Sequence, residues 1–172
     1  IVTGASRGIG VRIAQVLAMA GASVVITARP SADGGNTTLE RVADDLCRDG
    51  ARALAVQCDS ASEEGVRTLT RIAKENFGRV DVLVNNAATR LSTRLLDTAP
   101  SEFERIFRVN VLGPFLLWRH VIPEMIVSGG GNIINLTSTN ARQQPFFGMA
   151  PYRMTKFALT YLSIDLALEV AS

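Results

Sequence analysis

The segment Thr3-Gly4-Ala5-Ser6-Arg7-Gly8-Ile9-Gly10 sets the architecture expected for this chain. It follows the apolar pair Ile1-Val2 and precedes a helical pattern over Val11–Ala20. Glycines at this spacing allow a tight turn, let the backbone approach a bound group and seat the helix on the strand. The helix start then offers free N–H groups and a partial positive charge to a pyrophosphate. The segment predicts a dinucleotide-binding turn, with a glycine-rich turn that binds no ligand as the alternative.

Strand-like and helix-like segments alternate along the rest of the chain. The expected strands are Ser23–Ala28, Ala53–Cys58, Val80–Val84 and Asn132–Leu136. The expected helices are Thr38–Asp49, Ala61–Phe77, Ser101–Val127 and Tyr152–Val170. Repeated strand–helix units with almost continuously apolar strands indicate a parallel sheet with helices on both faces. The prediction is one α/β domain over 1–172, a Rossmann-type doubly wound sheet.

Local signals predict several details of this fold. Pro114 and Pro123 lie inside the expected helix Ser101–Val127, so we expect kinks there. Ser60, with Glu63 three residues later, is the expected capping box of the helix Ala61–Phe77. The stretch Pro30–Thr37 is the most loop-like part of the chain. Because the chain starts within a strand pattern and stops within a helical one, we expect it to be truncated at both ends, without its C-terminal substrate-binding part.

Composition excludes several classes of protein. Apolar residues make up 47% of the chain, charged residues 20%, and the net charge is +2. This balance is typical of a globular protein and predicts neither a nucleic-acid surface nor a membrane span. No targeting segment is visible, so we expect a cytoplasmic protein. Cys47, Cys58 and the single His120 have no spacing typical of a metal site and are interpreted as structural.

The expected strands end in polar or glycine-bearing pairs. In a parallel α/β sheet, ligands bind at the carboxyl ends of the strands, where the strand order reverses. The residues expected at this edge are Thr3-Gly4, Ala28-Arg29, Asp59, Asn85-Asn86 and Thr137-Ser138. Their convergence predicts a binding site.

Tyr152 and Lys156 are four residues apart and share one face of the last expected helix. Tyrosine ordinarily has a pKa of about 10, which makes it a poor base at neutral pH. Lowering a pKa by about three units requires about 4 kcal/mol. Lys156 together with an oxidised nicotinamide could supply this, whereas one partly exposed lysine could not. The alternative is a solvent-exposed helical pair without a catalytic role.

These motifs together resemble the short-chain dehydrogenase/reductase family over the whole chain. The glycine segment is similar to its T-G-x-x-x-G-x-G, and Tyr152 with Lys156 to its Y-x-x-x-K. Asn85-Asn86-Ala87-Ala88 is similar to its N-N-A-G, with Ala88 where glycine is usual. Asn110 matches its active-site asparagine, and Asn135–Ser138 its serine-bearing strand end.

The resemblance implies four catalytic residues and a set of cofactor contacts. Tyr152 would exchange the proton at the substrate oxygen, and Ser138 would orient that oxygen. Lys156 would stabilise the phenolate and bind the nicotinamide ribose, while Asn110 would hold a water that links Lys156 to solvent. Asp59 would contact the adenine, and Asn86 with Ala87 the adenosine side. The full set of expected cofactor contacts is Gly4, Ser6, Arg7, Gly8, Ile9, Gly10, Arg29, Asp59, Ser60, Asn86, Ala87, Tyr152 and Lys156.

The residues near the adenosine ribose predict NADP(H) rather than NAD(H). Relatives that prefer NAD carry an acid at the end of the second strand, but this chain has Ala28 followed by Arg29. Arg7 adds a second guanidinium, and two such groups suit a 2′-phosphate. Alternatively, both arginines are solvated surface charges.

The leading functional hypothesis is an NADP(H)-dependent oxidoreductase that acts on a carbonyl or a secondary alcohol. The alternatives are a non-redox member of the same fold and a catalytically silent dinucleotide sensor or scaffold. Four apolar residues near the site are consistent with an apolar substrate or with loop packing: Leu91, Phe146, Phe147 and Met149. The helix Tyr152–Val170 carries two apolar stripes, so we expect a homodimer or homotetramer, unless missing C-terminal residues cover the second stripe.

Overall fold

The computed structural model describes residues 1–30, 37–141 and 147–171. Within these ranges the chain forms a five-stranded parallel sheet in the order β3-β2-β1-β4-β5. The strands are β1 (Val2–Thr3), β2 (Val24–Ala28), β3 (Ala53–Gln57), β4 (Val82–Asn85) and β5 (Asn132–Asn135). The chain runs outward from β1 in one direction and then restarts at β4 in the other. This confirms the predicted Rossmann-type doubly wound sheet and puts the switch point between β1 and β4.

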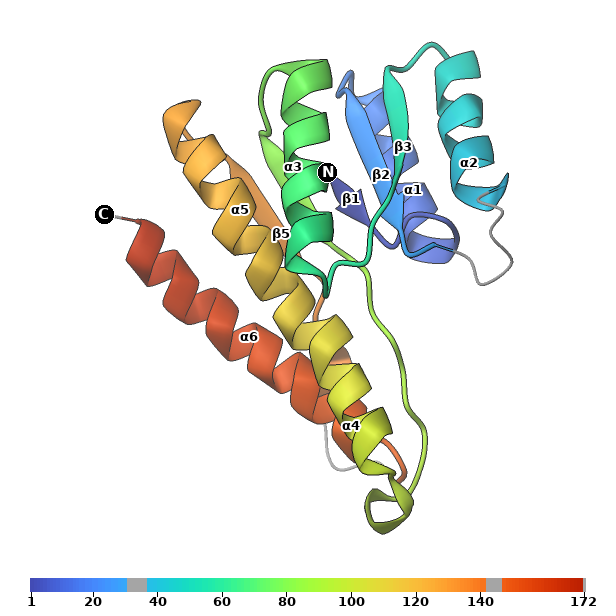
Figure 1. Cartoon of the computed structure of the whole chain (residues 1–172), viewed down its shortest axis with the longest axis vertical. Coiled ribbons are helices and arrows are strands. Elements are labelled where there is room, and N and C mark those ends of the chain that lie inside the picture. Colours follow the sequence, from blue (N-terminus) through green and yellow to red (C-terminus); the bar gives the residue numbers. More distant parts are fainter. Residues whose placement is uncertain (31–36, 142–146, 172) are drawn as a thin grey trace.

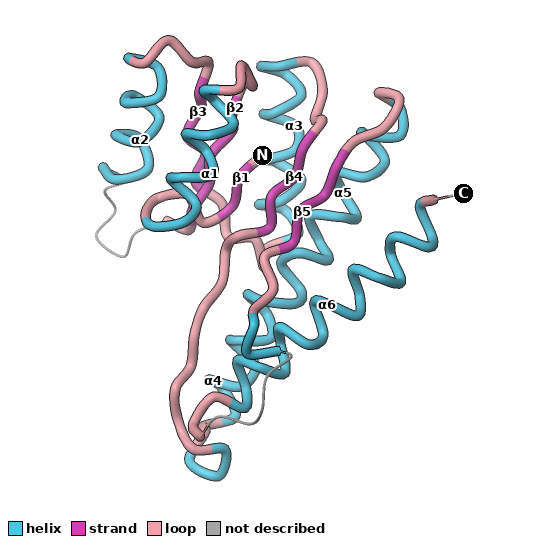
Figure 2. The backbone as a smooth tube through the Cα atoms, turned by 180° about the vertical axis from the view of Figure 1, so that it is seen from behind, coloured by secondary structure: helices cyan, strands magenta, loops and turns pink. Residues whose placement is uncertain are grey.

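Helices cover both faces of the sheet (Figures 1 and 2). The helices are α1 (Gly8–Met19), α2 (Thr37–Arg48), α3 (Glu63–Phe77), α4 (Pro100–Phe107), α5 (Gly113–Val127) and α6 (Ala150–Val170). Short 3-10 turns form at Leu95–Asp97 and Thr139–Ala141. One apolar core joins α1 and α2 to the sheet through residues such as Ala14 and Leu39. The other joins α3, α5 and α6 through Leu69, Leu117 and Leu159.

The expected helix Ser101–Val127 is not continuous. A π-helical turn over Arg108–Leu112 separates α4 from α5. Proline has no N–H to give to the carbonyl four residues earlier, and its ring clashes with that carbonyl. For Pro114 this carbonyl belongs to Asn110, so the chain widens at that point into a π turn. The kink predicted at Pro114 is therefore a change of helix type, whereas α5 continues through Pro123.

The capping prediction for α3 is wrong by two residues. The helix begins at Glu63, and Ser62 is its N-cap, with its hydroxyl accepting the N–H of Gly65 at 3.2 Å. Ser60 is instead buried at the strand-end edge of the sheet, where it packs against Gly113. Both serines precede the helix closely, so the local pattern alone does not distinguish them.

Candidate active site

A cleft of about 630 Å³ lies at the carboxyl ends of β1, β2, β3 and β4. Residues from the glycine segment, from the loops after β2, β3 and β4, and from the π turn line it. They are Gly4, Ser6, Arg7, Gly8, Ile9, Gly10, Ala28, Arg29, Pro30, Cys58, Asp59, Ser60, Asn86, Ala87, Ala88 and Val109. All predicted cofactor contacts except Tyr152 and Lys156 are among them. The sequence did not point to Pro30, Cys58 or Val109 as lining residues.

The glycine segment needs its glycines. Gly4 and Gly8 have φ angles of 65° and 60°, a region that favours glycine. A methyl group at Gly10 would collide with the carbonyl of Gly4, so α1 could not approach β1 as closely. No side chain caps the start of α1, and its first turn carries no acidic residue. The N–H groups at this helix end are therefore available to an anion.

Thr3 and Asn86 fix the turn to the neighbouring strand. The Asn86 side-chain amide donates to the carbonyls of Thr3 at 2.8 Å and Gly4 at 3.1 Å. In return, the Thr3 hydroxyl accepts the N–H groups of Asn86 and Ala87, both at 3.0 Å. Asn86, expected to contact the cofactor, thus also holds the turn in shape. Ala88 lines the cleft with an ordinary negative φ, so its methyl group does not strain the loop.

Charge is distributed unevenly around the cleft. Arg7 and Arg29 are exposed at its rim, and neither forms an ion pair with any residue that the structure describes. Asp59 turns one carboxylate oxygen back to the N–H of Ala61 at 3.0 Å. The Cys58 thiol is buried beside it, and burial raises the pKa of that thiol to about 11. Cys58 therefore stays protonated, in agreement with its interpretation as a structural residue.

Lys156 and Tyr152 lie in the first turns of α6. The Lys156 side chain is buried, and its ammonium group donates to the carbonyl oxygen of Leu136 at 2.6 Å. Burial lowers the pKa of Lys156 to about 8. Leu136 directly follows β5, and Ser138 lies two residues further along. The start of α6 is thus bound to the strand end that carries Ser138, and both Tyr152 and Ser138 are half-buried.

Asn110 lies in the π turn and is fully buried. Its side-chain oxygen accepts the N–H of Thr89 at 2.8 Å, and its amide nitrogen donates to the Thr89 carbonyl at 2.9 Å. The same nitrogen also donates to the Thr155 hydroxyl at 3.0 Å. Asn110 therefore joins the loop after β4 to the second turn of α6. Thr89 and Thr155 were missed in the sequence, although a hydroxyl residue inside Y-x-x-x-K could have drawn attention to Thr155.

A second polar network forms around Asn135, at the end of β5. The Asn135 side-chain oxygen accepts hydrogen bonds from the Asn85 amide at 2.7 Å and the Trp118 indole at 3.3 Å. The Asn135 amide donates to the Ser163 hydroxyl at 2.9 Å. These contacts join β4, β5, α5 and α6. Asn85 is thus a structural residue of the sheet edge, and only Asn86 reaches the cleft.

The predicted apolar residues near the site lie in different environments. Met149 is buried, with its sulfur 3.6 Å from the Arg90 guanidinium. Phe147 is 80% exposed, and Leu91 is half-buried. Phe146 lies outside the described residues. Met149 therefore packs within the chain, and loop packing is sufficient to explain its apolar character.

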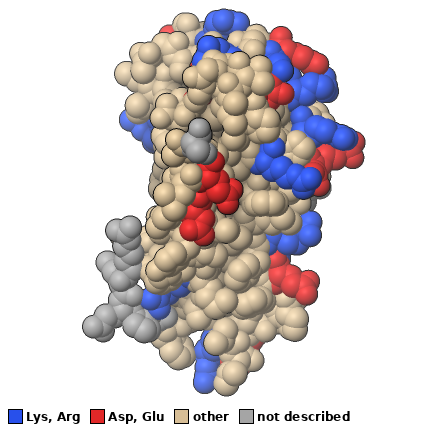
Figure 3. All heavy atoms as spheres, turned by 90° about the vertical axis from the view of Figure 1, so that its left-hand side faces the viewer, with Lys and Arg blue, Asp and Glu red and all other residues tan. Residues whose placement is uncertain are grey.

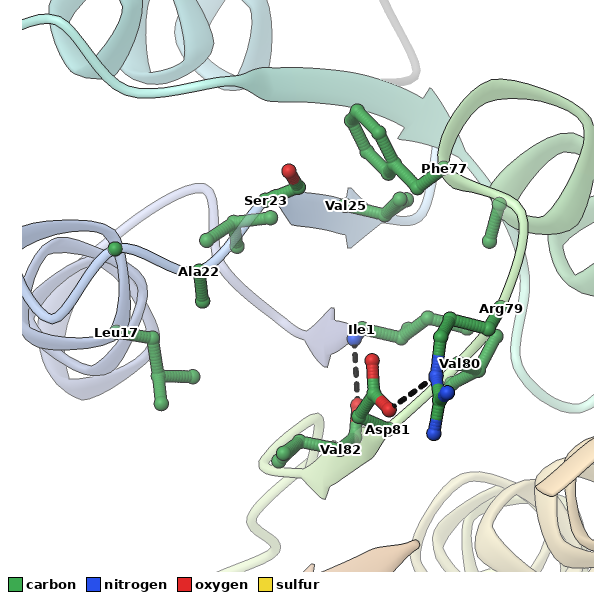
Figure 4. Close-up of a pocket in the computed structure, with 13 residues that line it drawn as sticks. Ile1, Leu17, Ala22, Ser23, Val25, Phe77, Arg79, Val80, Asp81 and Val82 are labelled. Carbon is green, nitrogen blue, oxygen red and sulfur yellow. Dashed lines mark hydrogen bonds and ion pairs between the residues drawn. The ribbon is translucent and has the colours of Figure 1, made fainter. Parts of the chain in front are cut away.

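A separate cavity of about 310 Å³ lies at the opposite, amino ends of the strands (Figure 4). Ile1, Phe77 and Asp81 are among its lining residues, and the Ile1 amino group donates to the Val82 carbonyl at 2.7 Å. None of the predicted site residues lines it. The described ranges contain no group of three metal-ligating side chains and no helix long and apolar enough to span a bilayer. The candidate site is therefore the cleft at the carboxyl edge together with the start of α6.

Comparison with known proteins agrees with this geometry. The sequence profile described as short chain dehydrogenase matches residues 1–172. The chain belongs to the short-chain dehydrogenase family. An oxidoreductase of Thermotoga maritima is 38% identical over 99% of the chain, and the 7α-hydroxysteroid dehydrogenase of Escherichia coli is 36% identical over 99%. The chain spans 64% of the length of each of these relatives.

A solved structure shows the same backbone. The crystal structure of a metagenomic short-chain oxidoreductase in complex with NADP superimposes with a TM-score of 0.90 at 34% identity. The superposition covers 99% of this chain and 75% of the metagenomic oxidoreductase chain. The short-chain dehydrogenase fold of this chain, with its parallel sheet and flanking helices, is therefore established.

Proposed function

We propose that this short-chain dehydrogenase is an NADP(H)-dependent oxidoreductase that interconverts a small-molecule carbonyl and its alcohol. The observation that carries the proposal is the connection of Lys156, through Leu136, to the strand end that bears Ser138. Lys156 shares α6 with Tyr152, and its hydrogen bond to Leu136 connects this helix to the strand end that carries Ser138. The three proposed catalytic side chains are therefore held in one part of the structure. A catalytically silent sensor would be expected to lose one of the four proposed catalytic residues, and this chain keeps Asn110, Ser138, Tyr152 and Lys156.

The cleft fits a dinucleotide. The uncapped start of α1 and the bare Cα of Gly10 leave room and N–H donors for a pyrophosphate. Asp59 and Ala87 line the side expected for the adenosine. When bound, the nicotinamide supplies or accepts the hydride, which no protein side chain can do. The NADP held by the solved relative supports this choice of cofactor class.

The preference for NADP(H) over NAD(H) rests on charge. Arg29 lines the cleft directly after β2, which ends in Ala28 rather than in an acid, and Arg7 lines it from the glycine segment. Guanidinium groups make charge-assisted, often bidentate hydrogen bonds to phosphate. With no acidic partner in the described chain, both arginines are available to a 2′-phosphate. An NAD ribose would leave this charge without a counterion.

The side chains at the start of α6 would divide the acid–base work. In the reductive direction the Tyr152 hydroxyl gives its proton to the substrate oxygen, and in the oxidative direction the phenolate takes it back. The Lys156 cation stabilises that phenolate by proximity. Ser138 donates a hydrogen bond to the substrate oxygen and orients it. Asn110, held in the π turn, bonds to Thr155 of α6, and the family resemblance suggests that it would also hold a water between Lys156 and solvent.

We further propose that the protein forms a homodimer or homotetramer through α6 and the start of α5. Four residues of α6 are 42–73% exposed: Phe157, Tyr161, Ile164 and Leu168. An apolar groove of about 280 Å³ between the π turn, α5 and α6 continues this surface. The corresponding side of the molecule has a broad uncharged area beside one acidic cluster (Figure 3). A second copy, presenting the same surface about a two-fold axis, would cover it.

A cofactor-oxidation screen tests the enzymatic assignment. The purified protein is mixed with NADPH and a panel of ketones and aldehydes, and the absorbance of the reduced cofactor is followed. At least one carbonyl compound should accelerate NADPH loss above the rate without substrate. Tight NADPH binding without turnover of any carbonyl compound would favour the silent sensor instead.

A further inference from the structure

Thr155 is the buried hydroxyl residue inside the Tyr152-to-Lys156 segment, and its side chain is fully shielded from solvent. The Thr155 hydroxyl donates to the Tyr152 carbonyl at 2.7 Å and accepts the Asn110 amide at 3.0 Å. A hydroxyl has one proton, and here the proton goes to Tyr152, so the contact with Asn110 uses a lone pair of the oxygen. Thr155 therefore makes both bonds at once in a defined direction.

The Asn110 amide is fixed by the same set of bonds. Its two protons go to the Thr89 carbonyl and to Thr155, while its oxygen accepts the Thr89 N–H. A flipped amide would place oxygen against the Thr89 carbonyl and nitrogen against the Thr89 N–H, so only one orientation satisfies all partners. The Arg105 guanidinium donates a hydrogen bond to the Thr89 hydroxyl at 2.9 Å. It also donates to the Glu102 carboxylate at 2.7 Å. The anchor for Asn110 is thus itself fixed to α4.

We propose that Thr155 is a positioning residue that couples Asn110 in the π turn to the backbone of Tyr152. This inference rests on the proposed oxidoreductase function. Through its two bonds, Thr155 sets the first turn of α6 relative to the π turn and so aims the Tyr152 ring at the substrate oxygen. The residue itself touches neither the cleft nor the reacting atoms. Its loss should therefore affect turnover more than cofactor binding.

Thr155→Val is the direct test because valine keeps the β-branched shape and removes the hydroxyl. It leaves a buried Asn110 proton without an acceptor and releases the Tyr152 carbonyl. We expect kcat to fall by about 10- to 100-fold, the effect of a small misplacement of a catalytic group. The Kd for NADPH should stay close to that of the parent, and the pH profile of kcat should move to higher pH, because Tyr152 would be further from the best position relative to Lys156. Thr155→Ser restores the hydroxyl and should restore most of the lost kcat.

Thr160→Val is the matched control on the same helix. The Thr160 hydroxyl also donates to a helix carbonyl, that of Lys156 at 2.9 Å, but Thr160 makes no tertiary hydrogen bond within the described chain. It should retain kcat and the parental pH profile. If Thr155→Val does not fold, Thr155→Cys applies the same test, because a thiol is a weak donor and acceptor and should give an intermediate loss of kcat.

The outcomes separate this inference from the proposed function. An unchanged kcat and pH profile in Thr155→Val, or a Thr155→Ser variant as slow as Thr155→Val, would overturn the positioning role. If Thr160→Val were as impaired as Thr155→Val, the effect would belong to the helix in general and the inference would again fail. The proposed function fails separately, when the parent protein binds NADPH tightly but turns over no carbonyl compound in the screen.

Discussion

The ammonium group of Lys156 lies 2.6 Å from the carbonyl oxygen of Leu136, in a buried position where its pKa is lowered to about 8. A lysine that is buried for packing alone would be replaced by an apolar side chain at no loss, since a buried charge is unfavourable. This arrangement instead holds a cation next to the helix turn that carries Tyr152. The burial of Lys156 therefore has a measurable effect on stability as well as on activity.

The first prediction concerns the pH dependence of stability without cofactor. Below pH 8 the folded and unfolded chains both hold the Lys156 proton, and the folded state carries the full cost of burying the charge. Between pH 8 and 10.5 the unfolded chain binds more protons, so the free energy of unfolding rises with pH. Urea unfolding at pH 7 and pH 10 should show the parent gaining about 2 to 3 kcal/mol relative to Lys156→Met. A difference between the two proteins that does not vary with pH would show that Lys156 keeps an ordinary pKa.

The second prediction concerns cofactor choice. Arg29→Ala removes a guanidinium from the rim of the cleft, and one charge-assisted hydrogen bond accounts for about 1.5 to 3 kcal/mol. The Kd for NADPH should therefore rise by about 10- to 100-fold, whereas the Kd for NADH should change little. Arg12→Ala is the control, since Arg12 lies on α1 outside the cleft and bonds Gln15. Isothermal titration of both cofactors decides, and NADH bound as tightly as NADPH by the parent would refute the assignment.

The third prediction concerns self-association. Ile164 is 53% exposed in the middle of α6, so Ile164→Asp places a charge in the proposed interface. Light scattering should give an oligomer mass for the parent and a smaller mass for the variant, with the fold retained by circular dichroism. Val16→Asp makes the same change at a residue of α1 that is 60% exposed, and it should leave the mass unaltered. A monomeric parent that is folded and binds cofactor would rule out the interface.

The fold could be predicted from the sequence because its signals are local. Glycines at fixed spacing and short apolar runs specify a turn and buried strands, and the parallel topology then brings the strand ends to one edge. Gly4, Arg29, Asp59 and Asn86, which are far apart in the sequence, consequently line one cleft. No side-chain contact had to be known for this step.

What could not be predicted depends on tertiary contacts. Pro114 marked the place of the helix change, but the sequence showed neither that a π turn forms there nor that Asn110 in this turn bonds to Thr89 and Thr155. Met149 has the apolar side chain expected of a substrate contact, but it is buried within the chain. In each case the residue type allowed two environments, and contacts between segments distant in the sequence decided between them.

The central claim is that Tyr152 transfers the proton that accompanies hydride transfer. Tyr152→Phe removes the hydroxyl and keeps the ring, and it leaves the glycine segment and the arginines of the cleft untouched. With the best carbonyl substrate from the screen, NADPH oxidation should fall by about 100- to 10,000-fold, as is typical for a lost general acid, while the Kd for NADPH remains close to that of the parent. Turnover within about twofold of the parent, at unchanged cofactor affinity, would contradict the account, because general acid–base catalysis normally contributes far more than this.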